Sequence, residues 1–172
     1  ALRDRRVLSQ LDPSRADQLR DEYGEKVWSG EIETRAPLNT DVTTAIPVAD
    51  LGLEMEPGIY AMVARAAADK KNEWGPRATQ WFLVSDLGIS AYLGADGATV
   101  IVRALSDASA VADATVRLVA VNNDVLGEVK SDAQGFARFA PGLSRGTGGL
   151  APALVSVETG AGDYAFLYLT AP

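Results

Sequence analysis

The stretch ATQWFLVSDLGI, residues 78–89, decides the fold of this chain, because it joins two strand-like runs without a spacer. Residues 79–85 mix aromatic and branched aliphatic side chains with polar ones, which is typical of a β-strand. Asp86, Leu87 and Gly88 then lead straight into a second strand-like run that begins at Ile89. A junction this short leaves few free backbone dihedrals, so we expect a fixed angle between the two β units.

We place a domain boundary at this junction, which gives domains at residues 1–86 and 87–172. The second domain reads as seven short strands with Gly, Asp and Asn turns between them. Turn signals every ~8–12 residues are typical of an antiparallel Ig-like sandwich, so we predict an all-β fold. The seven strands are expected at residues 89–92, 99–104, 115–120, 125–130, 137–139, 154–158 and 164–169.

The first domain has fewer strand signals, expected at residues 27–34, 42–46, 58–66 and 79–85. We expect the centre of the 58–66 strand to be buried on both faces. Asp12 as N-cap, Pro13 at the first helical position and Gly24 as a stop predict one short helix over residues 13–23. The chain starts at Ala1 in mid-pattern, so we interpret the first domain as N-terminally truncated and the chain as a fragment.

The net charge and the absence of two residue types argue against several classes of function. The net charge of −7 disfavours nucleic acid and anionic membrane surfaces as partners. No run reaches the ~20 apolar residues of a membrane span, so we predict no direct membrane insertion. The chain has no Cys and no His, which removes a strong nucleophile, the commonest general base and the commonest metal ligand. We predict a protein that is not an enzyme, with no catalytic, cofactor-binding or metal-binding residues.

Three glycine-containing segments could bind a ligand or could simply form loops and turns. Residues 145–149, RGTGG, could cradle a phosphate, but they lack the Lys and hydroxyl residue that complete a P-loop, so we favour an inter-strand loop. Residues 131–135, SDAQG, and the pair Asp96-Gly97 could supply calcium ligands. They lack the spacing and terminal Glu of an EF-hand, so we favour β-turns.

Paired charged side chains are the next candidates. Glu31 with Glu33, and Glu54 with Glu56, lie two apart and could act as acid–base pairs of a glycosidase, but we favour solvated charges, as for the charge run at residues 69–73. Lys130 and Ser131 are adjacent. In a strand their side chains point to opposite faces, which argues against a Ser–Lys nucleophile pair.

A ligand platform could be formed by the aromatic residues Trp28, Trp74 and Trp81 with Tyr60 and Phe82. We favour core packing for Trp28, Tyr60 and Phe82, because they lie at the centres of predicted strands. Trp74 lies in a polar loop beside Gly75-Pro76. We expect it to be partly exposed and to contact a neighbouring domain.

Longer passages resemble the bacterial α2-macroglobulin family, in consistent order over nearly the whole chain. They are GEKVWSG (24–30), EPGIY (56–60), TQWFLVSDLG (79–88), VRLVAVNNDVLG (116–127), SDAQGFARF (131–139), RGTGGLAPAL (145–154) and GDYAFL (162–167). The resemblance implies two tandem macroglobulin-like β-sandwiches. It also implies a role as scaffold in a broad-spectrum protease inhibitor, whose frame carries a bait segment and, in many members, a thioester.

The thioester motif of the family, Cys-x-Glu-Gln, needs a Cys, and this chain has none. The implied partners are therefore neighbouring macroglobulin domains, and host or competitor proteases only through the parent protein. The resemblance implies a periplasmic location, with the parent anchored by lipid in some family members. The alternative is a cell-surface adhesion or carbohydrate-binding β-sandwich, which the fold pattern alone also permits.

Overall fold

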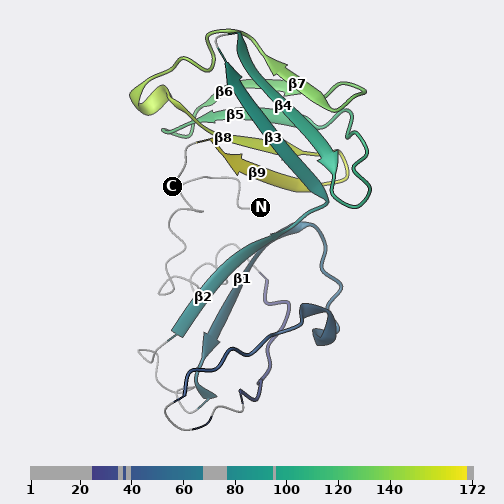
Figure 1. Cartoon of the computed structure of the whole chain (residues 1–172), viewed down its shortest axis with the longest axis vertical. Helices are drawn as coiled ribbons and strands as arrows, with labels where there is room; N and C mark the ends of the chain where they lie inside the picture. The colour runs from purple at the N-terminus through teal and green to yellow at the C-terminus, as the bar shows by residue number, and fades with distance from the viewer. Residues whose placement is uncertain (1–24, 35–36, 38–39, 68–76, 95, 170–172) are drawn as a thin grey trace. The chain divides into compact units, whose positions relative to one another are not determined.

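The computed structural model describes residues 25–34, 37, 40–67, 77–94 and 96–169, apart from the side chain of Ala49. The described residues form antiparallel β-sheets and short 3-10 turns (Figure 1), which confirms the all-β class. They divide into two compact units, one made of Glu56–Tyr60 with residues 82–169, the other of the remaining described residues. The division falls within β1 and β2, and the boundary at Asp86 and Leu87 stays a prediction. The helix expected at residues 13–23 and the loop with Trp74 lie outside the described residues.

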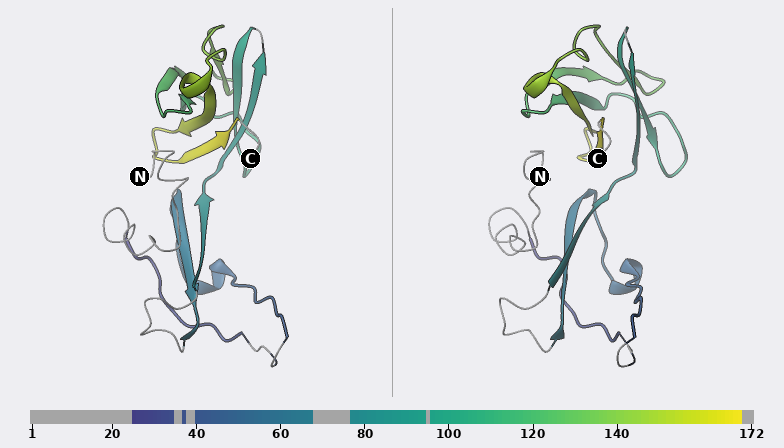
Figure 2. Two further views of the ribbon diagram at one scale, coloured as in Figure 1. Left: turned by 90° about the vertical axis from the view of Figure 1, so that its left-hand side faces the viewer. Right: turned by 60° about the vertical axis from the view of Figure 1, so that its left-hand side comes forward.

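Residues 87–168 contain all seven of the strands expected there. They are β3 (Leu87–Gly94), β4 (Gly97–Ala104), β5 (Thr115–Ala120), β6 (Val125–Lys130), β7 (Phe136–Phe139), β8 (Pro152–Glu158) and β9 (Tyr164–Tyr168). They form a three-stranded sheet, β3-β4-β7, and a four-stranded sheet, β6-β5-β8-β9. Figure 2 shows these sheets as two layers. β3 is longer than expected, because its hairpin with β4 stays paired out to Gly94 and Gly97.

The core of this sandwich follows the two-residue period of its strands. Val100 and Val102 of β4 are fully buried, and so are Val116 and Leu118 of β5. Side chains of β7, β8 and β9 complete the same cluster, and Leu83 near the end of β2 packs against it. Each sheet therefore buries one face against the other, as expected for aligned sandwich packing.

Two left-handed glycines shape the turns around this core. Gly97 and Gly135 have φ angles of +123° and +79°. A Cβ at Gly97 would collide with the carbonyl oxygen of Phe139, and one at Gly135 with that of Val102. These positions require glycine both for the backbone angle and for the space.

The first half contains β1 (Gly58–Arg65) and β2 (Arg77–Val84), which pair as a two-stranded sheet, and the 3-10 turn η2 (Val48–Leu51). The expectation of a doubly buried centre for β1 is wrong, since Met62 and Val63 are 39% and 45% exposed. Strands were also expected at residues 27–34 and 42–46, but the structure has no strand there. A strand needs a hydrogen-bonded neighbour as well as a suitable sequence.

None of the helices in the described part of the chain has the length and apolarity needed to cross a membrane.

Candidate functional site

The turn at residues 131–135 uses its carboxylate to hold itself together. Asp132 Oδ1 accepts hydrogen bonds from the amides of Gln134 and Phe136, both at 2.9 Å, and Oδ2 pairs with Arg138 at 2.9 Å. The hydrogen bond from the Phe136 amide, followed by those from Arg138 and Gln134, lowers the pKa of Asp132, and partial loss of solvent around the carboxylate only partly opposes this. The structure thus confirms the β-turn interpretation, and the carboxylate is used inside the turn.

The RGTGG segment is also an ordinary connector. It runs from the end of β7 into η4 (Gly148–Leu150), a single 3-10 turn, and then into β8. The Arg145 amide donates to Gly142 O at 3.1 Å, and Thr147 O and Gly148 O accept from the amides of Leu150 and Ala151 at 3.2 and 3.1 Å. A phosphate loop leads into an α-helix, whereas this segment leads into a three-residue 3-10 turn and then a strand.

Lys130 and Ser131 point to different partners, as their adjacency predicts. Lys130 Nζ donates to the carbonyl oxygen of Asp113 at 3.1 Å. Ser131 is buried, accepts a hydrogen bond from the Ala114 amide at 2.9 Å and donates to Val111 O at 2.7 Å. The serine fixes the loop before β5, so the pair has no nucleophilic geometry.

The paired carboxylates Glu31, Glu33, Glu54 and Glu56 are all exposed. Among the described residues, no three acidic, His or Cys side chains are grouped so that they could hold a metal ion. Asp96 lies at the exposed β3–β4 turn.

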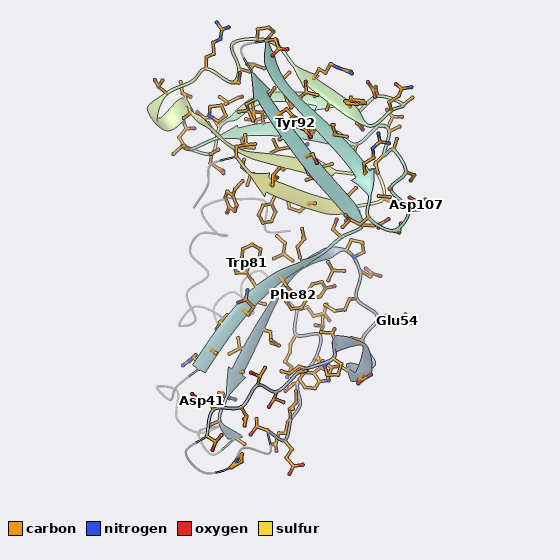
Figure 3. All side chains as sticks on the ribbon, viewed as in Figure 1. Asp41, Glu54, Trp81, Phe82, Tyr92 and Asp107 are labelled. Carbon is orange, nitrogen blue, oxygen red and sulfur yellow. The ribbon has the colours of Figure 1, made fainter. Side chains whose placement is uncertain are left out.

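Of the aromatic residues that the structure describes in the first half of the chain, some pack against each other and one is exposed. Tyr60 and Phe82 stack with ring centroids 5.7 Å apart, and the Tyr60 hydroxyl donates to Glu56 O at 2.7 Å. Trp81 and Phe82 leave β2 on opposite sides (Figure 3). Core packing is wrong for Trp28, which is 38% exposed and lies outside any strand. Without a paired strand, nothing fixes the face on which its ring would be buried.

β9 carries a row of three aromatic side chains that the sequence analysis did not predict. Tyr164, Phe166 and Tyr168 alternate along β9 and contact one another, with centroids 6.2 and 5.6 Å apart. Alternation along the strand is the signal that could have identified it. Tyr164 is only 7% exposed, so its ring does not offer the open face that stacking on a sugar requires.

Asp86 joins the start of β3 to two distant segments, which sequence reasoning did not foresee. Its carboxylate accepts from the Ser106 amide at 2.7 Å and from Ser106 Oγ at 2.8 Å. Its carbonyl oxygen accepts from the Leu105 amide at 2.7 Å, and its own amide donates to Asp163 Oδ2 at 3.0 Å. We call this set the Asp86 clasp. It fixes the first residue before β3 against two loops of the sandwich.

Arg117 is held between two acids on the outward side of the four-stranded sheet. Its Nε lies 2.7 Å from Glu128 Oε2, and an η-nitrogen lies 3.1 Å from Glu158 Oε2. The hydrogen bonds from Glu128 and then Glu158 raise the pKa of Arg117, which therefore stays charged. Arg117 also lines a shallow hollow of about 270 Å³ with Asn123 and Tyr164. Two carboxylates face a single guanidinium, so one negative charge is in excess, which disfavours anions in the hollow.

These features define a class of protein: an Ig-like β-sandwich module whose polar clusters brace loops and strands. The comparison with known families is more specific. The family model described as the bacterial alpha-2-macroglobulin MG3 domain matches residues 84–172, more than half of the chain. The chain therefore belongs to the bacterial alpha-2-macroglobulin family.

Solved structures show the same fold. The crystal structure of native alpha-2-macroglobulin from Escherichia coli spanning domains NIE-MG1 has a TM-score of 0.65 and 22% identity, over 83% of this chain and 64% of that one. The crystal structure spanning MG0-NIE-MG1 has a TM-score of 0.55 and 22% identity, over 73% and 38%. The cryo-EM reconstruction of the native E. coli protein has a TM-score of 0.50 and 19% identity, over 85% and 8%. The comparison with curated proteins found no match.

Proposed function

We propose that this chain is a scaffold segment of a periplasmic, alpha-2-macroglobulin-like protease inhibitor. The observation that carries the proposal is the family match over residues 84–172, which coincides with a complete seven-stranded sandwich. The chain spans 64% of the E. coli NIE-MG1 structure and 8% of the native E. coli chain, so inhibition would belong to a longer protein. Neighbouring macroglobulin domains would be the direct partners and proteases the indirect ones.

The braced loops support a mechanical role. Asp132, Ser131 and Asp86 use their polar groups on the chain's own backbone. Arg117 is engaged by two glutamates of its own sheet. Polar groups used in this way stiffen a module, as a frame that positions other domains requires.

The test compares protease inhibition by this chain with inhibition by a longer protein that contains it. The 172-residue chain and the longer protein are each incubated with several endopeptidases, and cleavage of a large protein substrate is followed. We expect the longer protein to inhibit and the chain alone neither to inhibit nor to hydrolyse. In the longer protein, Leu118→Asp should abolish inhibition by unfolding the sandwich, because Leu118 is fully buried.

The matched control is Leu150→Asp, at a side chain that is 51% exposed, which should leave inhibition intact. Inhibition or hydrolysis by the 172-residue chain alone would overturn the scaffold proposal. The scaffold proposal would also be overturned if Leu118→Asp unfolded the sandwich and the longer protein still inhibited as before. Binding of the chain to a glycan array would instead favour the carbohydrate-binding alternative.

A further inference from the structure

β3 forms an edge of the three-stranded sheet and pairs, among the described residues, with β4 alone. The other three edges of the two sandwich sheets are blunted. β7 has four residues and includes Arg138, and β9 has five. β6 carries Glu128 and Lys130, and its pairing with β5 has a register shift between Leu118 and Val119. β3 has eight residues, LGISAYLG, with no charge, no proline and no register shift in its pairing with β4. Short length, charge and irregularity are the usual protections of an edge, and β3 has none of them.

The hydrogen bonds of β4 reveal which peptide groups of β3 face outward. The Val102 amide donates to Gly135 O at 2.8 Å, and Val102 O accepts from the Val111 amide at 3.2 Å. Val102 therefore faces away from β3. In an antiparallel pair its opposite residue, Ile89, must also face away from β4. By the period of two, Ala91 and Leu93 do the same, which leaves three outward peptide groups in a row.

The start of β3 is closed, whereas its second half is open. The Leu87 amide donates to Ser85 Oγ at 3.0 Å, and Leu87 is buried. Tyr92 is 63% exposed and Leu93 is 46% exposed, one on each side of the strand. Tyr92 is labelled in Figure 3. An added strand would gain backbone hydrogen bonds and apolar contact at the same place.

Charge distinguishes the possible occupants of this edge. Asp86 and Asp96 stand just beyond the two ends of β3, and the whole chain has a net charge of −7. Both side chains are exposed, and the Asp86 carboxylate keeps its negative charge while it accepts hydrogen bonds from Ser106. Two copies that pair antiparallel about Ala91 would place Asp86 of one copy opposite Asp96 of the other. Like charges directly opposite each other are unfavourable in a sheet, whereas a strand with basic ends would meet acid at both.

We propose that the β3 edge, residues 89–93, binds an extended peptide segment of a partner protein by strand addition. The segment is apolar or uncharged at its centre and carries Lys or Arg at its ends. Its backbone bonds to Ile89, Ala91 and Leu93, and its side chains contact Tyr92 and Leu93. This inference rests on the geometry of β3 and is independent of the proposed scaffold function.

The probe is a synthetic peptide, acetyl-Lys-Val-Thr-Val-Thr-Val-Lys-amide, titrated into the 172-residue chain. Amide hydrogen exchange followed by NMR reports the contact residue by residue. We expect the Ile89, Ala91 and Leu93 amides to exchange more slowly by about tenfold or more at saturation, as hydrogen-bonded amides do. The Ser90 and Tyr92 amides already face β4 and serve as an internal reference.

Two peptide controls test the chemistry of recognition without changing the protein. N-methylation of the central Val and one adjacent Thr blocks both edges of the peptide strand and should weaken binding by about tenfold or more. Replacing both terminal Lys residues by Glu should weaken it comparably at low salt. Equal affinity of the Glu-ended peptide would overturn the charge argument, and equal affinity of the methylated peptide would overturn strand addition.

Protein variants give the matched comparison. Tyr92→Lys places a positive charge on the edge and should weaken binding, whereas Leu150→Lys makes the same kind of change at an exposed residue of η4 and should not. The proposal fails if the peptide does not bind, or if protection appears at amides outside β3. It also fails if raising the concentration of the chain alone protects the same three amides, because the occupant is then a second copy.

Discussion

β4 and β1 are both eight residues long and apolar at their centres, yet they differ in burial. Val100 and Val102 of β4 are fully buried, whereas Met62 and Val63 of β1 are 39% and 45% exposed. β4 lies between two strands and under a second sheet, while β1 has β2 as its partner in a two-stranded sheet. The difference shows that a second layer, rather than the apolar character of a strand, determines how deeply its side chains are buried.

The largest expected difference in stability is between truncating a buried side chain of the sandwich and truncating an exposed side chain of β1. Leu118→Ala in the sandwich should lower the free energy of unfolding by about 2–5 kcal/mol, because it leaves a cavity among fully buried neighbours. Met62→Ala in β1 should change it by about 0.5 kcal/mol or less. Urea unfolding followed by far-ultraviolet circular dichroism measures both. The comparison breaks if Met62→Ala destabilises as much as Leu118→Ala.

A second prediction concerns the turns that close the sandwich. Gly135→Ala should destabilise by about 2–3 kcal/mol, because it combines a left-handed φ with a collision against Val102 O. Gly142→Ala has a left-handed φ of +104° but open space around it, so about 1 kcal/mol is expected. Gly160→Ala has neither and should lie within about 0.5 kcal/mol of zero. Thermal unfolding of the three variants would show whether this order holds, and equal losses would contradict it.

The buried serine of the sandwich gives a third test. Ser131→Ala leaves the Ala114 amide and the Val111 carbonyl without their side-chain partner, so a loss of about 1–3 kcal/mol is expected. Ser90→Ala, on the exposed side of β3, is the control and should be neutral within about 0.5 kcal/mol. A neutral Ser131→Ala would mean that the loop before β5 does not depend on this hydroxyl.

The smallest effect should be the pH dependence that Asp132 contributes. Its pKa is lowered in the folded state, so the stabilisation is present above the unfolded value near 3.8 and is lost as the pH falls through the folded value. Asp132→Asn removes the ion pair with Arg138 and this dependence. The stability difference between wild type and variant should therefore shrink between pH 6 and pH 2, as urea titrations at each pH would measure. A difference that is constant with pH would contradict this role.

The sequence predicted the sandwich strand by strand, because Gly, Asp and Asn turns bracket each of its runs and every strand has a neighbour to pair with. The same alternation at residues 27–34 failed to predict a strand, since alternation describes the faces of a strand but supplies no partner. The plain interpretations of SDAQG, RGTGG and Lys130-Ser131 were local, so sequence spacing was sufficient for them. The Asp86 clasp and the Arg117 group join residues far apart in the chain, which spacing cannot reveal.

The Asp86 clasp also has a consequence for the order of folding. Asp86 and Ser106 are 20 residues apart, and Asp86 and Asp163 are 77 residues apart. During synthesis, the start of β3 leaves the ribosome long before its partner in the β8–β9 turn. Because contacts between distant residues form late, we expect the first strand of the sandwich to be secured at both loops only after the last hairpin has closed.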